Sequence, residues 1–441
     1  MKVRVIGGGL AGVEAAAVLA RRGHKVLLSE QKPVRFSPAH HDPNLGELVC
    51  SNSLKSLSPA TGSGLLKEEM KLLGSLILEA AETCKVPAGG ALAVDRSAFS
   101  RAVTQKISAL PGVEIVREEV TSLPEGPAVL ATGPLTEGAL YEALSALSGK
   151  CLHFYDAAAP IVTAESVDFG AAFSSSRYGK GGEDYLNCPM TREEYLAFWE
   201  ALTSAETVIL KDFEKREIFE GCMPVEIMAK RGPDTLRFGP LKPVGLTDPR
   251  TGRRPYAVVQ LRKENAAGTL FNLVGFQTNL KFPEQRRVFS LIPALKNAEF
   301  VKYGVMHRNS YLNAPEALDP FLRLKARPDL FVAGQLSGVE GYLESAATGI
   351  LCGLWASLLL EGREPVLPPA ETVIGSLVRY LNAPNPRFAP MNANFGILPP
   401  LPSTPRDKTV RNAALSERAI EEMKKYVARF RADGKTNGSA L

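Results

Sequence analysis

The sequence predicts an α/β fold in which a parallel sheet is interrupted by an inserted α+β domain. Three observations support this fold class. The chain begins with a strand, a glycine-rich turn and a helix; further strands follow up to Ala131; and one more strand–glycine–helix unit starts at Asp329, after a long stretch of different character. A sheet that the chain leaves and re-enters in this way indicates that the middle of the chain is an insertion.

Residues 2–30 are the segment on which this prediction mainly depends. Lys2 to Ile6 is rich in β-branched residues, as in a buried parallel strand, Val13 to Arg22 is an alanine-rich helical stretch, and Lys25 to Leu28 is a second strand that ends at Glu30. The turn between the first strand and the helix fits the pattern G-x-G-x-x-G and consists of Gly7, Gly8, Gly9, Leu10, Ala11 and Gly12.

Each part of this segment has a physical reason. Gly7 makes the tight turn, Gly9 lets the backbone approach a pyrophosphate, and Gly12 allows close packing of the helix on the strand. The free N–H groups at the start of the helix attract an anion, and the helix dipole adds to that attraction. Glu30 can accept hydrogen bonds from both hydroxyls of a ribose. The segment therefore predicts a bound dinucleotide.

Composition indicates an ordinary globular protein of more than one domain. The 441 residues are 45% hydrophobic and 22% charged, and the net charge of +5 permits a polyanionic partner without requiring one. No signal-peptide pattern is present, and the apolar stretch from Ile350 to Leu360 contains Ser357 and predicts a core helix. The six cysteines include no C-x-x-C pair. We therefore expect free thiols, no metal site, no membrane partner and a cytoplasmic location.

The remaining elements are assigned in chain order. The sequence predicts a proline-rich loop over residues 33–62, a helix over 64–84, a helix over 96–110 that Asp95 caps, and strands over 113–116 and 128–131. From Lys150 onward proline, glycine and aromatic residues become denser, and strand-like runs recur at 207–210, 257–261, 270–276 and 300–303. We therefore divide the chain into two domains. Residues 1–150 and 316–441 form the dinucleotide-binding domain, and the second of these ranges also contains a C-terminal helical tail near 416–430. Residues 151–315 form an insertion domain.

The dinucleotide is predicted to be FAD. The strand ending at Ala131 is followed by Gly133, and the late strand is followed by Gly334, Gln335 and a helix of small residues. This returning helix can present its N-terminus to the flavin and stabilise negative charge on the reduced ring. A two-domain NAD dehydrogenase would not need the returning unit. The fold is therefore predicted to be a Rossmann-like FAD-binding domain with an inserted α+β domain.

Two cysteines differ from the others in their setting. Cys50 lies in the loop after Glu30, where its apolar neighbours favour a core position, whereas Cys222 is flanked by glycine and proline at a predicted turn. The remaining cysteines are expected mainly in the core: Cys84 and Cys352 on apolar helical faces, and, less firmly, Cys151 and Cys188.

Beyond the glycine turn the chain resembles the TrmFO family, the folate- and FAD-dependent tRNA (uracil-5-)-methyltransferases. The resemblance extends from residue 1 to about residue 400. It is carried by ELVCSNSL (47–54), VPAGGALAVDR (86–96), YLNCPM (185–190), EGCMPVE (220–226), FGPLKPVGL (238–246), YGVMHRN (303–309) and GVEGYLESAATG (338–349). Gly8 stands where the family would have alanine, and the 40–45 loop and the end of the chain diverge.

The resemblance implies methylation of C5 of a uridine in the T-loop of tRNA. Methylenetetrahydrofolate would donate the one-carbon unit, and reduced FAD, regenerated by NADPH or NADH, would carry the methylene and supply the hydride. The family's two functional cysteines correspond to Cys50 and Cys222. We expect Cys222 to attack C6 and Cys50 to assist at the flavin-bound methylene or to accept the C5 proton, with the reverse assignment open. Both thiols are expected to be partly exposed, with pKa values lowered by nearby cations.

The resemblance also implies sites for folate, flavin and RNA. His307 would stack on the pterin, with Arg308 and Asn309 beside it. Tyr342, Glu344 and Ser345 would line the flavin or its access channel, unless they are only the polar first turn of a packed helix. The candidate RNA contacts are the basic residues Arg253, Arg254, Lys281, Arg286 and Arg287 of the insertion, with Arg250, Arg262 and Lys263 nearby; a solvated surface is the alternative. The target uridine would have to flip out of its stack.

The sequence leaves three other functions open. The same chemistry could act on ribosomal RNA. The protein could instead be a relative of the FAD- and folate-dependent enzyme that modifies the tRNA wobble uridine, although that family is longer. It could also be a flavin-bearing RNA-binding factor without turnover, against which the presence of Cys50, Cys222 and His307 argues. The oligomeric state and the preference between NADH and NADPH are not determined by the sequence.

Overall fold

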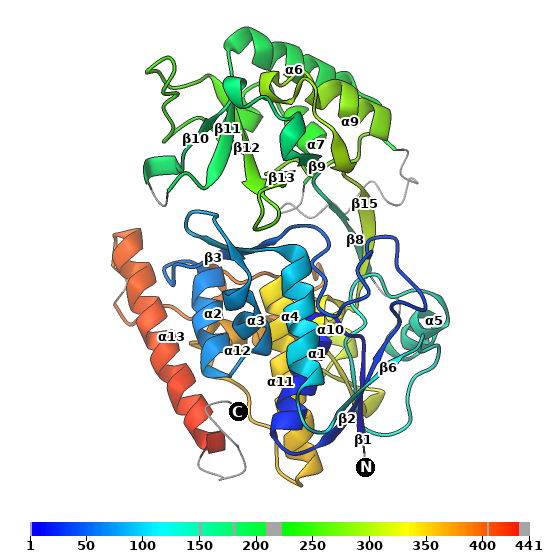
Figure 1. Cartoon of the computed structure of the whole chain (residues 1–441). Coiled ribbons are helices and arrows are strands. Elements are labelled where there is room, and N and C mark those ends of the chain that lie inside the picture. The colour runs from blue at the N-terminus through cyan, green and yellow to red at the C-terminus, as the bar shows by residue number, and fades with distance from the viewer. Residues whose placement is uncertain (1, 150–151, 180–181, 209–222, 404, 432–441) are drawn as a thin grey trace.

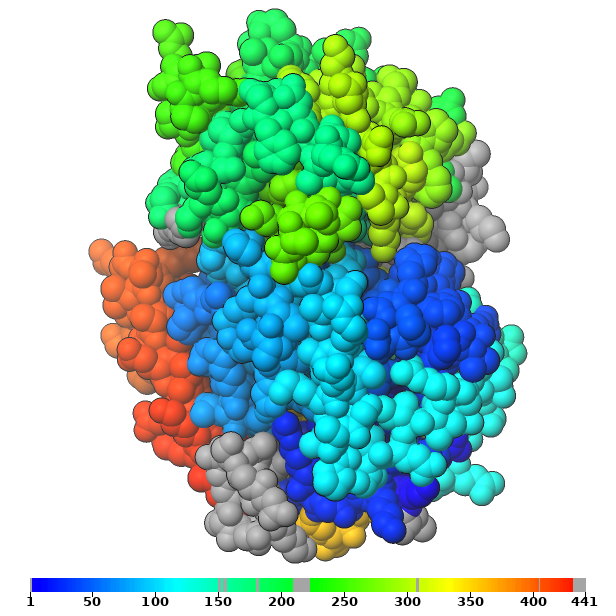
Figure 2. Space-filling view, viewed as in Figure 1, coloured from blue at the N-terminus to red at the C-terminus, as the bar shows by residue number. Residues whose placement is uncertain are grey.

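The computed structural model describes residues 2–149, 152–179, 182–208, 223–403 and 405–431. The chain forms two lobes joined by a two-stranded antiparallel ribbon of β8 (Leu152–Ala157) and β15 (Met306–Tyr311) (Figure 1). The lower lobe contains the N-terminal and C-terminal parts of the chain, and the upper lobe is built from the middle. Figure 2 shows the two lobes in contact across the front face of the molecule.

The lower lobe is built on a six-stranded sheet with the order β16-β17-β7-β1-β2-β6. Its strands are β1 (Lys2–Ile6), β2 (Lys25–Glu30), β6 (Val113–Arg117), β7 (Ala128–Leu130), β16 (Arg323–Leu324) and β17 (Arg327–Val332). All neighbours pair in parallel except β16 with β17. Strand β17 returns from the far end of the sequence to pair with β7, so the predicted α/β fold with an insertion is confirmed.

The helices of the lower lobe surround this sheet in more than one layer (Figure 1). They are α1 (Leu10–Arg21), α2 (Gly62–Leu72), α3 (Leu76–Thr83), α4 (Arg96–Ser108), α5 (Gly138–Ser148), α10 (Ala314–Ala317), α11 (Tyr342–Leu360), α12 (Val373–Asn382) and α13 (Lys408–Arg431). By length and composition α11 could cross a membrane, but 83% of its most apolar window is buried inside the fold. It is the central helix of the core, as its apolar sequence predicts.

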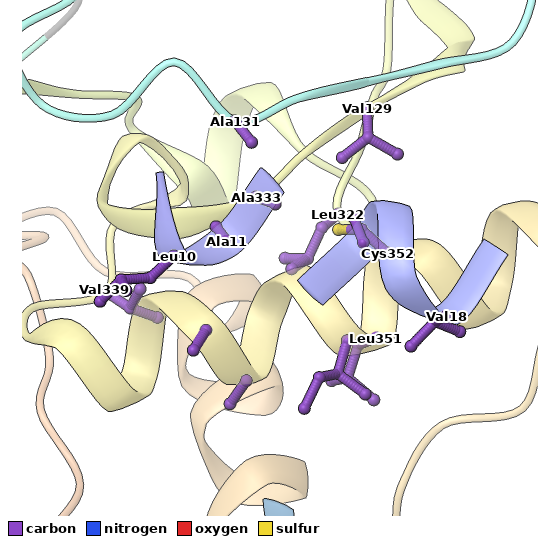
Figure 3. Close-up of a cluster of buried hydrophobic side chains, with 14 of the residues drawn as sticks. Leu10, Ala11, Val18, Val129, Ala131, Leu322, Ala333, Val339, Leu351 and Cys352 are labelled. Carbon is purple, nitrogen blue, oxygen red and sulfur yellow. The ribbon is translucent and has the colours of Figure 1, made fainter. Parts of the chain in front are cut away.

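The closest helix contact is between α1 and α11, and small residues make it possible. A Cβ atom added at Gly349 would lie 2.1 Å from the carbonyl oxygen of Ala11, and one at Gly353 would lie 2.7 Å from that of Ala15. Such distances are too short for any side chain larger than hydrogen. Figure 3 shows side chains of both helices in one apolar cluster, among them Leu10, Ala11, Val18, Leu351 and Cys352.

The upper lobe contains an antiparallel six-stranded sheet with the order β10-β11-β12-β13-β9-β14. Its strands are β9 (Ile161–Thr163), β10 (Phe173–Ser174), β11 (Tyr185–Met190), β12 (Ala257–Lys263), β13 (Leu270–Leu273) and β14 (Phe300–Lys302). The helices packed on it are α6 (Arg192–Ser204), α7 (Val225–Ala229), α8 (Thr235–Phe238) and α9 (Phe282–Phe289). This is the mixed α+β character that the sequence predicts; the boundaries at 150 and 315 stay a proposal.

Short elements complete the described part of the chain. A small sheet of the lower lobe has the order β3-β5-β4 and consists of β3 (Ser53–Ser56), β4 (Lys85–Val86) and β5 (Ala91–Val94). The 3₁₀ helices are Ala164–Ser166, Phe169–Ala171, Arg177–Gly179, Pro293–Leu295, Gly334–Ser337 and Phe395–Ile397.

The structure departs from the sequence prediction at several element boundaries. The helix expected over 64–84 is two helices, because Gly74 takes a φ of +75° and Ser75 caps α3. Strands β3 to β5 are too short to give a periodic signal and were missed, as was α12, which lies in the proline-rich tail. Helix α13 begins at Lys408 rather than near residue 416. Of the strand expected over 207–210, Thr207 forms an isolated bridge with Leu280, while 209 and 210 lie outside the described residues.

A buried carboxylate attaches the tail to the lower lobe. Glu69 of α2 accepts hydrogen bonds from the N–H groups of Val373 at 2.7 Å and Ile374 at 2.9 Å, which are the first two residues of α12. Thr372 caps the same helix through the N–H of Gly375. Burial raises the pKa of Glu69 from 4.5 to about 8, although the two N–H groups act in the opposite direction.

We predict that Glu69→Ala destabilises the protein by about 3 kcal/mol, because it leaves two buried N–H groups unpaired and creates a cavity. The folded-state pKa of about 8 lies above the unfolded value of 4.5. The stabilisation by Glu69 is therefore complete below pH 4.5 and is lost as the pH rises through 8. Urea unfolding of wild type and variant over this pH range measures both effects.

Glu68→Ala is the matched control, because Glu68 is the sequence neighbour of Glu69, is only partly buried and pairs with the exposed Lys71. It should change stability by less than about 0.5 kcal/mol. Equal losses for the two variants would refute the anchoring role of Glu69.

Candidate active site

A cavity of about 390 Å³ opens where β1, β2 and β7 end, which is within the roughly 300–1,000 Å³ usual for small-molecule sites. It lies at the switch point of the sheet, since β1 pairs with β2 on one side and with β7 on the other. The residues expected to contact FAD that line it are Gly7, Gly8, Gly9, Leu10, Ala11, Glu30, Ala131, Gly133, Gly334, Gln335, Tyr342 and Ser345. Cys50 and, from the part of the chain expected to form the insertion, Gln277 and Asn309 also line it.

The glycine turn has the geometry of a phosphate cradle. Gly7 has a φ of +102°, and a Cβ added there would lie 2.4 Å from the carbonyl oxygen of Ala131. A Cβ added at Gly12 would lie 1.8 Å from the oxygen of Gly7, so Gly12 serves helix–strand packing and does not line the cavity. Gly9 differs from both, because nothing lies within 4 Å of its added Cβ and no side chain caps α1 there. An anion can therefore approach the first turn of α1, and the site fits the pyrophosphate of FAD.

Glu30 is held in place by the backbone around it. Its carboxylate accepts hydrogen bonds from the N–H of Gly8 at 2.7 Å and from the N–H of Lys32 at 2.9 Å. Each carboxylate oxygen keeps a further lone pair for a ribose hydroxyl. A Cβ added at Gly8 would lie 2.4 Å from the Leu45 side chain, so this chain has glycine there because Leu45 fills the space.

Glu344 does not line the cavity, contrary to the sequence-based expectation. Its side chain is fully buried and accepts hydrogen bonds from the N–H of Ala393 at 2.9 Å and from Lys55 Nζ at 3.3 Å. Side chains two positions apart in an α-helix point about 200° apart around its axis, so Glu344 points away from the face that carries Tyr342. It ties the start of α11 to the tail of the chain.

Cys50 and Tyr342 form the chemically distinctive contact of the cavity. The Tyr342 oxygen lies 3.0 Å from Cys50 Sγ, and it accepts hydrogen bonds from the N–H groups of Cys50 at 2.8 Å and Ser51 at 3.3 Å. Burial, and then the negative charge of Cys50, raise the pKa of Tyr342 well above its ordinary value, so its hydroxyl keeps its proton. Because the oxygen already accepts two bonds, that proton points to Sγ, and an O–H donor favours the thiolate over the thiol.

The other cysteines have different surroundings. Cys188 and Cys352 are fully buried, and burial raises the pKa of both thiols, that of Cys188 to about 12. Cys84, at the end of α3, is half-buried. Cys151 and Cys222 lie outside the described residues. Burial thus makes Cys188 and Cys352 unreactive, and both occupy the core positions that the sequence predicts.

The described residues on either side of the stretch 209–222, which carries Cys222, bond to residues 277–279, of which Gln277 lines the cavity. Before it, the N–H of Val208 donates to the carbonyl oxygen of Asn279 at 2.9 Å. After it, the N–H of Val225 donates to the carbonyl oxygen of Gln277 at 2.7 Å. Gln277 itself lines the cavity with Cys50.

The three residues expected to bind folate lie on strand β15 of the connecting ribbon. In the register with β8, His307 pairs with Asp156, Arg308 with Tyr155, and Asn309 with Phe154. The side chain of Asn309 is buried and lines the cavity. The side chains of His307 and Arg308 lie outside the described part of the structure.

The expected RNA-binding residues separate into two groups. Arg253 and Arg254 are exposed in the turn before β12. Lys281, Arg286 and Arg287 are exposed at or on α9, where Lys281 pairs with Glu206 at 2.6 Å and Arg287 with Glu284 at 2.6 Å. Arg250 pairs with Asp248. Arg262, which we had grouped with them, is buried and points to the lower lobe, so it cannot belong to a solvated surface.

Sequence reasoning missed several residues around the cavity. Lys32 and Glu47 form a buried ion pair of 3.1 Å within its lining. Lys32 lies at the start of a loop without periodicity, so no pattern marked it, whereas Glu47 begins the ELVCSNSL segment and its pairing was not recognised. Arg96 and Arg262 contact the residues next to Cys50. Arg96 does lie in the VPAGGALAVDR segment, which therefore held a signal whose role was not recognised.

Comparisons with known proteins identify relatives over nearly the whole chain. Residues 2–364 match the family model described as glucose inhibited division protein A. The protein "Methylenetetrahydrofolate--tRNA-(uracil-5-)-methyltransferase TrmFO" of Moorella thermoacetica is 57% identical over 95% of this chain and 97% of its own length. The protein of the same name from Geobacter sulfurreducens is 58% identical over 97% of this chain and 99% of its own length. The crystal structure of Aquifex aeolicus GidA has a similar fold, with a TM-score of 0.70 and 18% identity over 98% of this chain and 76% of that chain.

We predict that Gly9→Ala abolishes flavin binding without loss of fold stability. The added methyl meets no protein atom within 4 Å and projects into the space that the pyrophosphate needs. The purified variant should lack flavin absorbance, while its thermal midpoint equals that of wild-type protein from which flavin has been removed.

Gly7→Ala is the contrasting variant, since its methyl would meet Ala131 and its φ is positive. It should lose stability as well as flavin. Gly90→Ala, also without neighbours within 4 Å, is the neutral control. Retention of flavin by Gly9→Ala would exclude the turn as the pyrophosphate site.

Proposed function

Because this chain belongs to the TrmFO family within the GidA-related flavoproteins, we propose that it methylates C5 of a uridine in the T-loop of tRNA. It is a methylenetetrahydrofolate–tRNA-(uracil-5-)-methyltransferase that uses FAD. The observation that carries the mechanism is one cavity lined by the glycine turn, by Cys50 and by Gln277, the attachment point of the Cys222 segment.

The residues of the lower lobe fit FAD at both ends of the cavity. The open space over Gly9 and the uncapped start of α1 would hold the pyrophosphate, and Glu30 would hold the ribose. The uncapped start of α11 at Gly341 and Tyr342 would face the flavin. When bound and reduced by NADPH or NADH, FAD carries the one-carbon unit and supplies the hydride that completes the methyl group.

The two thiols would divide the work on the uracil ring. The Cys222 thiolate forms a bond with C6, and the electron pair of the C5–C6 double bond makes C5 a nucleophile towards the one-carbon unit. Cys50 then takes the C5 proton, and departure of the Cys222 thiolate releases C6 again. The contact of Cys50 with the Tyr342 hydroxyl supports a reactive thiolate at this position.

Folate would bind between the two lobes. His307 would stack on the pterin, with Arg308 and Asn309 beside it. Asn309 lines the cavity, and the ribbon that carries all three residues joins the lobes, which supports this location. We place the protein in the cytoplasm, where tRNA and reduced nicotinamide are available.

We predict that Cys222→Ala cannot form a covalent complex with RNA containing 5-fluorouridine, whereas Cys50→Ala forms the complex but does not methylate. Fluorine at C5 cannot leave as a proton does, so the adduct at C6 accumulates when the attacking thiol is present. Denaturing electrophoresis of labelled RNA detects the complex, and transfer of label from methylenetetrahydrofolate measures turnover.

Cys84→Ala is the control, because Cys84 lies away from the cavity lining, and it should behave as wild type. An adduct in Cys222→Ala that disappears in Cys50→Ala would reverse the two roles. An adduct in both variants would exclude a cysteine nucleophile.

Of the two basic groups, we favour α9 as the RNA contact. The rings of Phe300, Tyr303 and Phe282 form a nearly parallel column, with centroids 5.4 and 4.8 Å apart, and the outermost ring, that of Phe282, is 51% exposed. Phe282, Tyr303, Arg286 and Arg287 line one shallow hollow. An unstacked base could extend the ring column while an arginine binds its phosphate. The turn with Arg253 and Arg254 offers charge without such a platform.

We predict that Phe282→Ala weakens tRNA binding about tenfold at every salt concentration, since one base–aromatic stack contributes about 1–3 kcal/mol. Arg286→Gln should instead reduce the slope of log affinity against log salt by about one phosphate contact. Filter binding over a salt series separates the two effects.

Phe238→Ala, which removes an 83% exposed ring on α8, and Arg253→Gln are the matched controls. Equal effects of the α9 variants and these controls would remove α9 from the RNA site.

A further inference from the structure

The loop that carries Cys50 lies at the seam between the lobes and is held from both sides. Residues 48–52 belong to no helix or strand, and β3 begins after them at Ser53. Their backbone groups therefore need other partners. The partners of these backbone groups are the side chains of Arg96 and Lys302, the Tyr342 hydroxyl and the N–H of Val94. Arg262 adds contacts to two side chains of the loop.

Arg96 holds the part of the loop that precedes Cys50. This residue begins α4, and its Nη1 donates to the carbonyl oxygens of Leu48 at 2.7 Å and Val49 at 3.1 Å. Its Nε donates to the carboxylate of Glu264, which follows β12 of the upper lobe. The side chains of Arg96 and Glu264 are only 17% and 6% exposed. One guanidinium therefore joins the Cys50 loop to the inserted lobe, in the fixed fork that arginine provides.

The upper lobe holds the part of the loop that follows Cys50. Arg262 Nε donates to Asn52 Oδ1 at 2.9 Å, and its Nη2 donates to Ser51 Oγ at 3.0 Å. Asn52, which is fully buried, donates from Nδ2 to the carbonyl oxygens of Val94 and Lys263, both at 3.0 Å. Cys50 thus lies between two guanidinium contacts, one from each lobe.

The same residues set the charge around the thiol. Burial disfavours the charge of Arg96, but Glu264 first, and then Tyr342 and Cys50, raise its pKa. Because such coupling is reciprocal, the charge of Arg96 favours the Cys50 thiolate by the same amount. Lys302 of β14 lies on the opposite side, with Nζ 3.5 Å from the Val49 oxygen.

Lys302 and the acidic residues Glu47 and Glu264 also act on this region. Burial, followed by the positive charge of Arg96, lowers the pKa of Lys302, and Glu47, Glu264 and Cys50 act in the opposite direction. Arg96, Lys302 and Tyr342 therefore interact with Cys50 directly, Glu264 and Glu47 act on the two cations, and Arg262 contacts the neighbouring Ser51.

We propose that Arg96 is a positioning residue for Cys50, and that Glu264 and Arg262 make the position and charge of this thiol depend on the seating of the inserted lobe. The inference rests on the proposed role of Cys50 and adds to it a link between the lobe that would bind RNA and the thiol on the flavin side. Displacement of the upper lobe would remove the contacts of the loop with Arg262, Lys263 and Lys302 together with the carboxylate partner of Arg96.

The test is the pH dependence of Cys50 alkylation by iodoacetamide, followed at the Cys50 peptide by mass spectrometry in the full-length purified protein. Arg96→Gln should raise the midpoint of alkylation by about one pH unit, because the cation beside the thiolate is lost. Glu264→Gln keeps a hydrogen-bond acceptor for Arg96 but removes the opposing charge, so it should lower the midpoint. A purely structural defect would shift both variants in the same direction.

Arg96→Lys separates charge from position. It should keep the midpoint of the wild type but reduce kcat for methylation at least tenfold, with KM for tRNA unchanged, because lysine cannot hold both carbonyl groups and Glu264 together. Arg101→Gln, an exposed arginine of the same helix, is the control and should leave both readouts unchanged.

An unchanged midpoint in Arg96→Gln, or shifts of equal sign in Arg96→Gln and Glu264→Gln, would overturn the proposal. If Arg96→Gln does not fold, the other two variants decide. A downward shift in Glu264→Gln with a loss of kcat in Arg96→Lys supports the proposal, and the absence of either result overturns it. Failure of the proposed function would appear differently: Cys50→Ala would methylate fully, while Arg96→Gln and Glu264→Gln would still show their alkylation shifts.

Discussion

The structure depends on the close crossing of α1 and α11. Hydrogen atoms at Gly349 and Gly353 face the backbone of Ala11 and Ala15, and no other residue type leaves that space free. The crossing joins the first helix of the chain to one that begins more than three hundred residues later. It brings the uncapped starts of both helices to one cavity, where the start of α1 lies at the glycine turn and the start of α11 lies beside the thiol of Cys50. The first turn of a helix attracts negative charge, so the cavity has two positions that favour an anionic group.

The seam between the lobes differs from the contact of α1 with α11, which is apolar. Polar groups make it: the Tyr185 hydroxyl donates to the Ala88 oxygen, the N–H of Gly89 donates to Asp184, and the N–H of Ala266 donates to Asp95. Interfaces of this polar kind permit relative motion more readily than an apolar core does. The lobes are therefore held together by polar contacts, unlike the apolar contact of α1 with α11 inside the lower lobe.

The cysteines show how surroundings decide the chemistry of one residue type. Cys188 and Cys352 are enclosed by apolar side chains, which disfavour the thiolate and leave both thiols inert. Cys50 contacts a hydroxyl donor and lies close to the guanidinium of Arg96, which favour the thiolate. Sequence neighbours alone assigned Cys50 to the core; the polar groups that surround it and the residues next to it come from α4, α11 and β12, all distant in sequence.

The sequence by itself determined the elements whose signal is local: the glycine turn, the strands of the parallel sheet, the capped helix after Asp95 and the apolar helix α11. It also carried the motifs from which the family could be identified. Only the tertiary structure decided that Glu344 points away from the cavity, that Arg262 is buried at the seam, and that Arg96 holds the Cys50 loop. The physical reason is the distance along the chain over which each effect acts. Turn chemistry and periodicity act between residues close in the chain, whereas the burial, charge and partners of a side chain are fixed by segments that meet only after folding.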